Sequence, residues 1–282
     1  MTRLLMYFAL VVAVFTCTTS AFAIHADIQP RNVFPGDAFM VRLSDIAPSQ
    51  AASVFIEGAE VPLEGCGEGC ALGIGAVGID TTPGEKSVII NSGPHRLTIT
   101  LSVRTPNFPE MRLKLPQDKV SLGPEDLARA KKEEEKLKEI WQQITPRLFQ
   151  GDFILPLPNP VSAVFGAKRI INDQTVSVHR GIDLRGKQGE KIRAANYGRT
   201  VLAEELFFGG NTLVIDHGAG IYTVYMHLDR FAVNRGDLVA KGDIIGFVGS
   251  TGRATGPHLH FGVKILSINT NPLSLMKLQI SE

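Results

Sequence analysis

The sequence predicts a mostly β protein with a small β-sandwich domain, a linker helix and a second β domain, in that order. Two observations predict this order. Short β-branched and apolar stretches, punctuated by glycine and proline, fill both ends of the chain. Residues 124–145 instead mix charges of both signs at a spacing of four, which is typical of a helix. The 282 residues, 44% of them hydrophobic, suffice for one large domain or two modest ones.

The first 23 residues resemble a secretory signal peptide that is cleaved after Ala23. Arg3 supplies the positive start, Leu4–Phe15 is an apolar run, and small residues flank Phe22. The run is shorter than the roughly 20 residues that span a bilayer, so we expect no stable membrane span after cleavage. An uncleaved anchor and a lipoprotein on Cys17 stay open as alternatives. The protein is therefore expected to be exported, either to a periplasm or into the medium.

Residues 24–118 are expected to form the β-sandwich domain, and no chemistry is visible in it. Cleavage leaves Cys66 and Cys70, which favour a short-loop disulfide in an oxidising compartment, with a two-thiol metal site as the alternative. His25 and His95 are isolated and predict a surface or structural role. The expected strands are Ala38–Leu43, Ser53–Ile56, Ser87–Ile90 and Leu97–Val103.

Residues 119–149 are expected to be a helical linker. Pro124 suits the first turn of a helix, where Glu125 and Asp126 would lie near its positive end. The apolar stripe is imperfect, so a solvated linker helix is favoured over a helix that binds a partner. The net charge of +1 gives no reason to expect a nucleic-acid partner.

Residues 150–282 are expected to form the second domain, and they contain five of the seven histidines. Its expected strands are Thr212–Asp216, Ile221–Leu228, Ile244–Val248 and Leu259–Ile265. His258 and His260 alternate with apolar residues on a strand, so both side chains point to the same face. His179 and Asp183 add an imidazole and a carboxylate, both of which zinc accepts.

Three motifs resemble those of the lysostaphin-like, or LytM-type, zinc metallopeptidases of family M23. In chain order they are His-x-x-x-Asp, Tyr-x-His and Gly-Pro-His-Leu-His-Phe-Gly. The resemblance covers about residues 153–275 and implies an antiparallel β-sheet. It also extends to Pro160–Gly166, which resembles the opening strand of the family. The recurring core segments that match are Gly210-Asn211, Ile215–Gly218 and Gly249–Gly252.

The resemblance implies a role for each residue of these motifs. It makes His179, Asp183 and His260 the ligands of one Zn²⁺ per chain, and His227 and His258 the catalytic histidines. His217 is expected to be structural or at the surface. Manganese or iron can also occupy nitrogen–oxygen sites, but zinc is favoured.

The resemblance implies an endopeptidase that hydrolyses peptide cross-links or stem peptides of bacterial peptidoglycan by metal-activated water. A histidine is the expected base, because no glutamate lies beside a ligand as in His-Glu-x-x-His enzymes. The alternatives are a non-catalytic activator of wall-splitting enzymes and a zinc hydrolase of secreted proteins. The sequence identifies no divisome or wall-enzyme partner. We also expect the N-terminal domain to shield the catalytic groove, since a wall hydrolase needs restraint in its own compartment.

Overall fold

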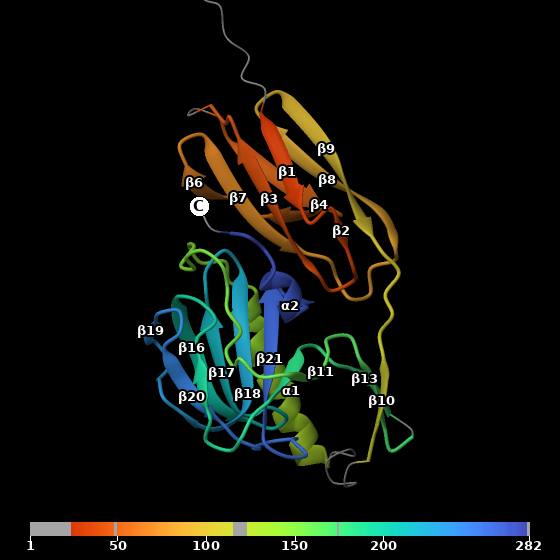
Figure 1. The fold of residues 1–282 in the computed structure, drawn as a ribbon, viewed down its shortest axis with the longest axis vertical. Helices are drawn as coiled ribbons and strands as arrows, with labels where there is room; N and C mark the ends of the chain where they lie inside the picture. The colour runs from red at the N-terminus through yellow and green to blue at the C-terminus, as the bar shows by residue number, and fades with distance from the viewer. Residues whose placement is uncertain (1–23, 48–49, 115–122, 174, 281–282) are drawn as a thin grey trace, which may run out of the picture.

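The computed structural model describes residues 24–47, 50–114, 123–173 and 175–280. The expected signal peptide, residues 1–23, lies outside the described residues. Figure 1 shows two β-rich halves stacked along the long axis, with the N-terminal half above the C-terminal half. Within the described ranges, no helix is both long and apolar enough to cross a membrane. The mostly β fold class predicted from the sequence is confirmed.

The N-terminal half is the predicted β-sandwich. One sheet has the order β1-β3-β7-β6 and the other the order β2-β9-β8-β4-β5. Val41 and Leu43 from the first sheet share a core with Val54, Val88 and Leu101 from the second. The strands are β1 His25–Gln29, β2 Asn32–Val33, β3 Ala38–Ser44, β4 Ala52–Ile56, β5 Ala59–Val61, β6 Glu64–Gly67, β7 Cys70–Ala76, β8 Gly84–Ser92 and β9 His95–Val103.

The favoured disulfide is present and joins Cys66 to Cys70 across the β6–β7 hairpin. Gly69 in the connecting turn has a positive φ of 65°, a conformation that glycine adopts without steric cost. The alternative of a two-thiol metal site is therefore wrong in this structure.

The C-terminal half is built on a ten-stranded sheet whose main path is β11-β14-β21-β18-β17-β16-β19. All of its strand pairs are antiparallel, as the resemblance implied. Its strands are β11 Val161–Ala163, β14 Ile182–Arg185, β15 Lys191–Arg193, β16 Gly198–Leu206, β17 Gly210–Asp216, β18 Ile221–Phe231, β19 Leu238–Val239, β20 Ile244–Val248, β21 His258–Ile265 and β22 Ile268–Thr270.

A third, small sheet crosses the expected domain boundary. Strand β10 (Glu110–Leu113) pairs in parallel with β12 (Lys168–Ile171), which in turn pairs with β13 (Thr175–Val178). Residues 110–113, grouped by sequence with the N-terminal domain, thus extend a hairpin of the C-terminal half (Figure 1).

Helix α1 spans Pro124–Trp141 and ends four residues before the expected end of the helical segment. Pro124 lies in its first turn, where the missing N–H is not needed. The indole of Trp141 packs edge-on against the ring of Tyr222, with 5.3 Å between ring centroids. Lys136 pairs with Glu204 of β16 at 2.5 Å. Arg129 and Glu133, earlier in the helix, also bond to the backbone of Glu205 and Phe207, so the linker helix is docked along the sheet over most of its length.

The two halves share apolar packing where they meet. Met40 and Leu72 of the sandwich belong to the same buried cluster as Leu275, from the short helix α2 (Pro272–Leu275). The backbone N–H of Ala38 donates to Ser274 Oγ at 2.8 Å, and Asn271 donates to Asp37 at 2.9 Å. The sandwich thus packs on the C-terminal end of the chain.

Candidate metal centre

Two neighbouring strands present the central side chains. In the antiparallel register of β14 and β21, Asp183 lies opposite His260 and Arg185 lies opposite His258. Because strand side chains alternate between faces, all four point to the same face of the sheet. Leu259 and Phe261 point to the other face, where both are fully buried. The expected alternation of the His-Leu-His motif is confirmed.

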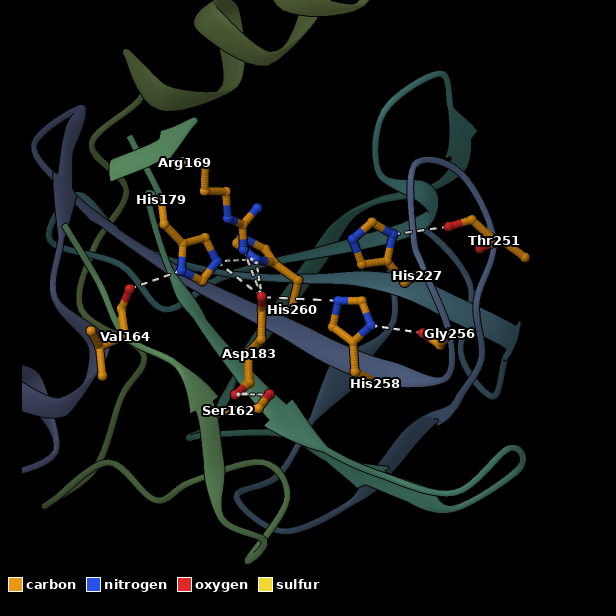
Figure 2. A network of polar contacts seen from close by, with 10 residues as sticks. All are labelled: Ser162, Val164, Arg169, His179, Asp183, His227, Thr251, Gly256, His258 and His260. Carbon is orange, nitrogen blue, oxygen red and sulfur yellow. Dashed lines mark hydrogen bonds and ion pairs between the residues drawn. The ribbon is translucent and has the colours of Figure 1, made fainter. Parts of the chain in front are cut away.

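His179 enters the site from the segment just before β14. Gly181 allows the close approach, because a Cβ there would lie 2.7 Å from Nε2 of His260 and 2.6 Å from the carbonyl oxygen of Phe261. The imidazole of His179 is almost fully buried. Figure 2 shows His179 and His260 converging on the Asp183 carboxylate.

His227 reaches the site through an irregularity in β18. Met226 lies opposite His260 in the β18–β21 register, so regular alternation would send His227 to the other face. His227 instead has a positive φ of 65°, rare for a residue other than glycine, where the β17–β18 register shifts. A bulge of this kind re-aims a side chain. The ring centroid of His227 comes to lie 4.8 Å from that of His258.

Three potential ligand atoms converge. His179 Nε2 lies 2.9 Å from Asp183 Oδ1 and 3.0 Å from His260 Nδ1, and the latter lies 2.8 Å from the same carboxylate oxygen. Ligands of a tetrahedral zinc ion, at 2.0–2.1 Å from it, are roughly 3.3 Å apart. The three atoms are therefore slightly closer than a tetrahedral edge. Within the described residues, this trio is the one group of His, Cys, Asp or Glu that could hold a metal ion.

The hydrogen bonds of His179 test whether a cation fits. Its Nδ1 lies 2.9 Å from the carbonyl oxygen of Val164, which can only accept, so Nδ1 carries the proton. Nε2 then bears a lone pair that faces the Asp183 carboxylate, another acceptor. Two acceptors at 2.9 Å repel each other unless a proton or a metal ion lies between them. The donor set of two imidazoles and one carboxylate fits a metal ion with one position left open.

The same kind of contact orients the other two histidines. The Nδ1 of His227 donates to the carbonyl oxygen of Thr251 at 2.9 Å, and that of His258 donates to the carbonyl oxygen of Gly256 at 2.8 Å. In each ring the other nitrogen, Nε2, makes no hydrogen bond within the described residues. That of His258 lies 4.0 Å from Asp183 Oδ1 (Figure 2).

Charges around the carboxylate keep it ionised. Burial raises the pKa of Asp183, but the imidazoles of His179 and His260 outweigh that effect and keep its pKa well below the usual range. Arg169 on β12 donates to the second carboxylate oxygen, Oδ2, at 2.6 Å. Oδ1 is thereby left for the histidine side of the site.

Burial, followed by the charges of His260 and His258, lowers the pKa of His227 to about 4. His227 is therefore a neutral imidazole at neutral pH. A neutral imidazole with its Nε2 lone pair exposed to the site can take a proton from water.

The structure thus brings together all five residues singled out in the sequence, namely His179, Asp183, His227, His258 and His260. Sequence reasoning missed Arg169 and the three carbonyl groups that orient the rings. Arg169 lies on a separate hairpin with no motif of its own. Every residue has a backbone carbonyl group, so the sequence does not show which of them will orient a histidine ring.

His217 does not join the site, and its expected structural role fits its surroundings. It is fully buried, donates through Nδ1 to the carbonyl oxygen of Tyr197 at 2.8 Å, and accepts at Nε2 from the Thr223 hydroxyl at 2.7 Å. Burial lowers its pKa to about 4.

Two cavities adjoin the centre. One, of about 540 Å³, is lined by Asp183, His227 and His258. The other, of about 1090 Å³, extends from His260 to the apolar side of helix α1. Among the described residues, every one that lines these two cavities lies at position 127 or later. The lining therefore gives no support to the expected shielding of the groove by the N-terminal domain, which stays a prediction.

The comparisons with known proteins agree with the fold and the motifs. Residues 177–272 match the family model described as peptidase family M23. A crystal structure from Pseudomonas aeruginosa, assigned to peptidase M23, superposes with a TM-score of 0.68 at 26% identity. That match covers 86% of this chain and 94% of the other, so it includes both halves.

Curated relatives match over the C-terminal half. The DD-carboxypeptidase/endopeptidase Mpg of Neisseria meningitidis is 39% identical over 115 residues, which are 41% of this chain and 26% of that protein. The peptidoglycan DD-endopeptidase ShyB of Vibrio cholerae is 37% identical over 99 residues, or 35% of this chain and 22% of that protein. The chain thus matches about a quarter of the length of these relatives.

Proposed function

Because residues 177–272 of this chain are a peptidase domain of family M23, we propose that the protein is a zinc-dependent endopeptidase of bacterial peptidoglycan. Its substrates are peptide cross-links or stem peptides. Two relatives of its C-terminal half carry the names DD-carboxypeptidase/endopeptidase and peptidoglycan DD-endopeptidase. The single observation that carries the proposal is the convergence of His179 Nε2, Asp183 Oδ1 and His260 Nδ1 within 3.0 Å of one another.

His179, Asp183 and His260 would hold the ion. A zinc ion in such a site acts as a Lewis acid that lowers the pKa of water to about 7 and polarises the scissile carbonyl. Arg169 fixes the carboxylate by its contact with Oδ2, while the Val164 carbonyl oxygen fixes the ring of His179. The ligands are thus oriented before a metal ion binds.

His227 and His258 carry the proton transfers. Both rings are fixed with Nδ1 protonated and Nε2 free, so either can accept the proton of the attacking water. An imidazole protonated in this way can then stabilise the developing oxyanion or give its proton to the leaving amine. The adjacent rings, 4.8 Å apart, suit a division of these tasks between the two histidines.

We propose that the protein acts outside the cytoplasm, in a periplasm or after secretion. The support is the signal-like composition of residues 1–23 and the kind of substrate that the relatives' names state. N-terminal sequencing of the exported protein should find Ile24 as the first residue.

The function is tested with purified peptidoglycan. The protein comprising residues 24–282 should release new peptide ends that mass spectrometry identifies, and a chelator should abolish this release until zinc is added back. His260→Ala should show neither metal binding nor release. Intact peptides after incubation with the zinc-loaded wild type would contradict the proposal and favour a non-catalytic role.

A further inference from the structure

The cavity of about 540 Å³ beside the metal centre is strongly basic. Three arginines line it, namely Arg169, Arg185 and Arg253. Asp183 is the only carboxylate among the described residues of its wall, and that group already contacts Arg169. The cavity therefore has an excess of positive charge beside the place where a peptide bond would be cut.

Arg253 is the arginine most clearly prepared for a ligand. Its guanidinium stacks on the ring of Phe208, with Cζ 4.4 Å from the ring centroid, and its backbone N–H donates to the Phe208 carbonyl oxygen at 2.9 Å. The side chain is half-buried and has no carboxylate partner among the described residues. Burial, and then the charge of Arg169, lower the pKa of Arg253, so an anion nearby would stabilise its charged form.

The other two arginines support the same ligand chemistry. Arg185 extends from the same face of β14 as Asp183, is exposed, and has no partner for its side chain within the described residues. The Nε of Arg169 is buried and makes no hydrogen bond to any described residue. Planar guanidinium groups with unused N–H donors match the two oxygens of a carboxylate.

The residues that line the cavity indicate which part of the substrate would lie in it. His227 and His258 line it, and these are the rings that can give a proton to the leaving amine. His260 instead lines the larger cavity on the other side. The residue that supplies the leaving amine would therefore lie on the arginine side.

We propose that this cavity binds a free carboxylate on the substrate residue that supplies the leaving amine, with Arg253 as the specificity-determining residue. The inference rests on the proposed function and narrows its substrate class. Stem peptides that are cross-linked directly through a diamino dicarboxylic acid, and peptides that end in a free carboxylate, carry this group next to the scissile nitrogen. Glycine bridges do not, so the protein should discriminate against them.

The test compares two cross-linked peptides that differ in one group, a free carboxylate or a primary amide on the residue that supplies the leaving amine. Wild type should show a higher kcat/KM on the free carboxylate, mainly through a lower KM. Arg253→Gln should reduce this preference by about 10- to 100-fold, as expected for a charge-assisted hydrogen bond. Arg253→Lys should retain part of it, since it keeps the charge but not the planar fork.

Arg230→Gln is the matched control. Arg230 also stacks on a phenylalanine, with Cζ 3.8 Å from the ring centroid of Phe247, but it does not line the cavity. It should keep the wild-type preference. A preference that survives Arg253→Gln, or a wild type that has none, would overturn the inference while leaving peptidoglycan hydrolysis in place.

A binding measurement separates this inference from the proposed function. Calorimetry with the product peptide that bears the carboxylate should show binding that weakens in Arg253→Gln and with the amidated product. Such binding in a protein that hydrolyses no peptidoglycan would keep the carboxylate site and contradict the endopeptidase. Equal affinities of both products for wild type and variant would contradict the site.

Discussion

The C-terminal sheet contains two buried histidine clusters, and they differ in how their lone pairs are satisfied. Around His217, the polar groups are paired with one another. Ala195 N–H donates to the Tyr225 hydroxyl, which shares a hydrogen bond with the Thr223 hydroxyl. The Thr223 hydroxyl in turn bonds His217 Nε2, while Nδ1–H donates to the carbonyl oxygen of Tyr197. Every acceptor in that chain has a donor.

The metal centre has the opposite arrangement. The Nε2 atom of His179 and the Oδ1 atom of Asp183 both offer lone pairs across 2.9 Å. An unpaired buried acceptor costs free energy, so such a site persists where a cation offsets the cost. Burial alone therefore does not separate a functional histidine from a structural one. The two differ in what Nε2 faces, which is a hydroxyl group for His217 and a carboxylate for His179.

The largest expected effect in the comparison comes from the two histidines beside the ligands. His227→Ala and His258→Ala should each lower kcat on the order of 100- to 10,000-fold, because each removes a proton-transfer group. Both variants should keep one zinc ion per chain, measured by elemental analysis after desalting. His217→Gln is the control and should leave the zinc content unchanged. Loss of zinc in His227→Ala would instead make His227 a ligand.

A smaller effect is expected from Arg169, which contacts one oxygen of Asp183 and leaves the other to face the histidines. Partners of this kind orient a ligand, and removing one typically weakens metal binding by roughly 10- to 100-fold. Arg169→Gln should raise the dissociation constant for zinc by that factor in a competition assay with a chelating dye. The dissociation constant of Arg169→Lys should lie between those of wild type and Arg169→Gln. An unchanged affinity in both variants would show that Asp183 is positioned by the sheet alone.

The strands of the site were predictable because their patterns are local. Alternation placed His258 and His260 on one face, and β20 begins and ends as expected from its apolar residues. His227 was predicted through the resemblance, but its route into the site was not. The left-handed backbone at His227 reflects the tertiary pairing of β17 and β18, which no residue pattern encodes locally.

Long-range pairing also explains what was missed. Arg169 approaches Asp183 because the β12–β13 hairpin folds over the site, and β10 joins that hairpin from a segment 55 to 61 positions earlier. Residues 110–113 include apolar side chains, but nothing in their sequence predicts the strand with which they pair. The packing of the sandwich on α2 is equally a long-range contact, and no local residue pattern predicts it.

The smallest expected effect is on the free energy of unfolding, and it tests the hydrogen-bonded cluster around His217. The pKa of His217 is about 4 in the folded protein, against an ordinary value near 6.5. A lowered folded-state pKa means that the unfolded chain binds the proton first. The stabilising contribution is therefore complete above pH 6.5 and is lost as the pH falls toward 4. Between pH 8 and pH 5 it should fall by about 2 kcal/mol.

Urea unfolding of metal-free wild type and His217→Gln at both pH values measures this contribution. The variant should be less stable at pH 8, because it removes the hydrogen bonds of the His217 ring. From pH 8 to pH 5, however, its free energy of unfolding should fall by about 2 kcal/mol less than that of wild type. Other titrating groups act equally on both proteins and cancel in the difference. Parallel losses in the two proteins would mean that the buried His217 ring accepts a proton without opening its surroundings, and the distinction between the two clusters would then fail.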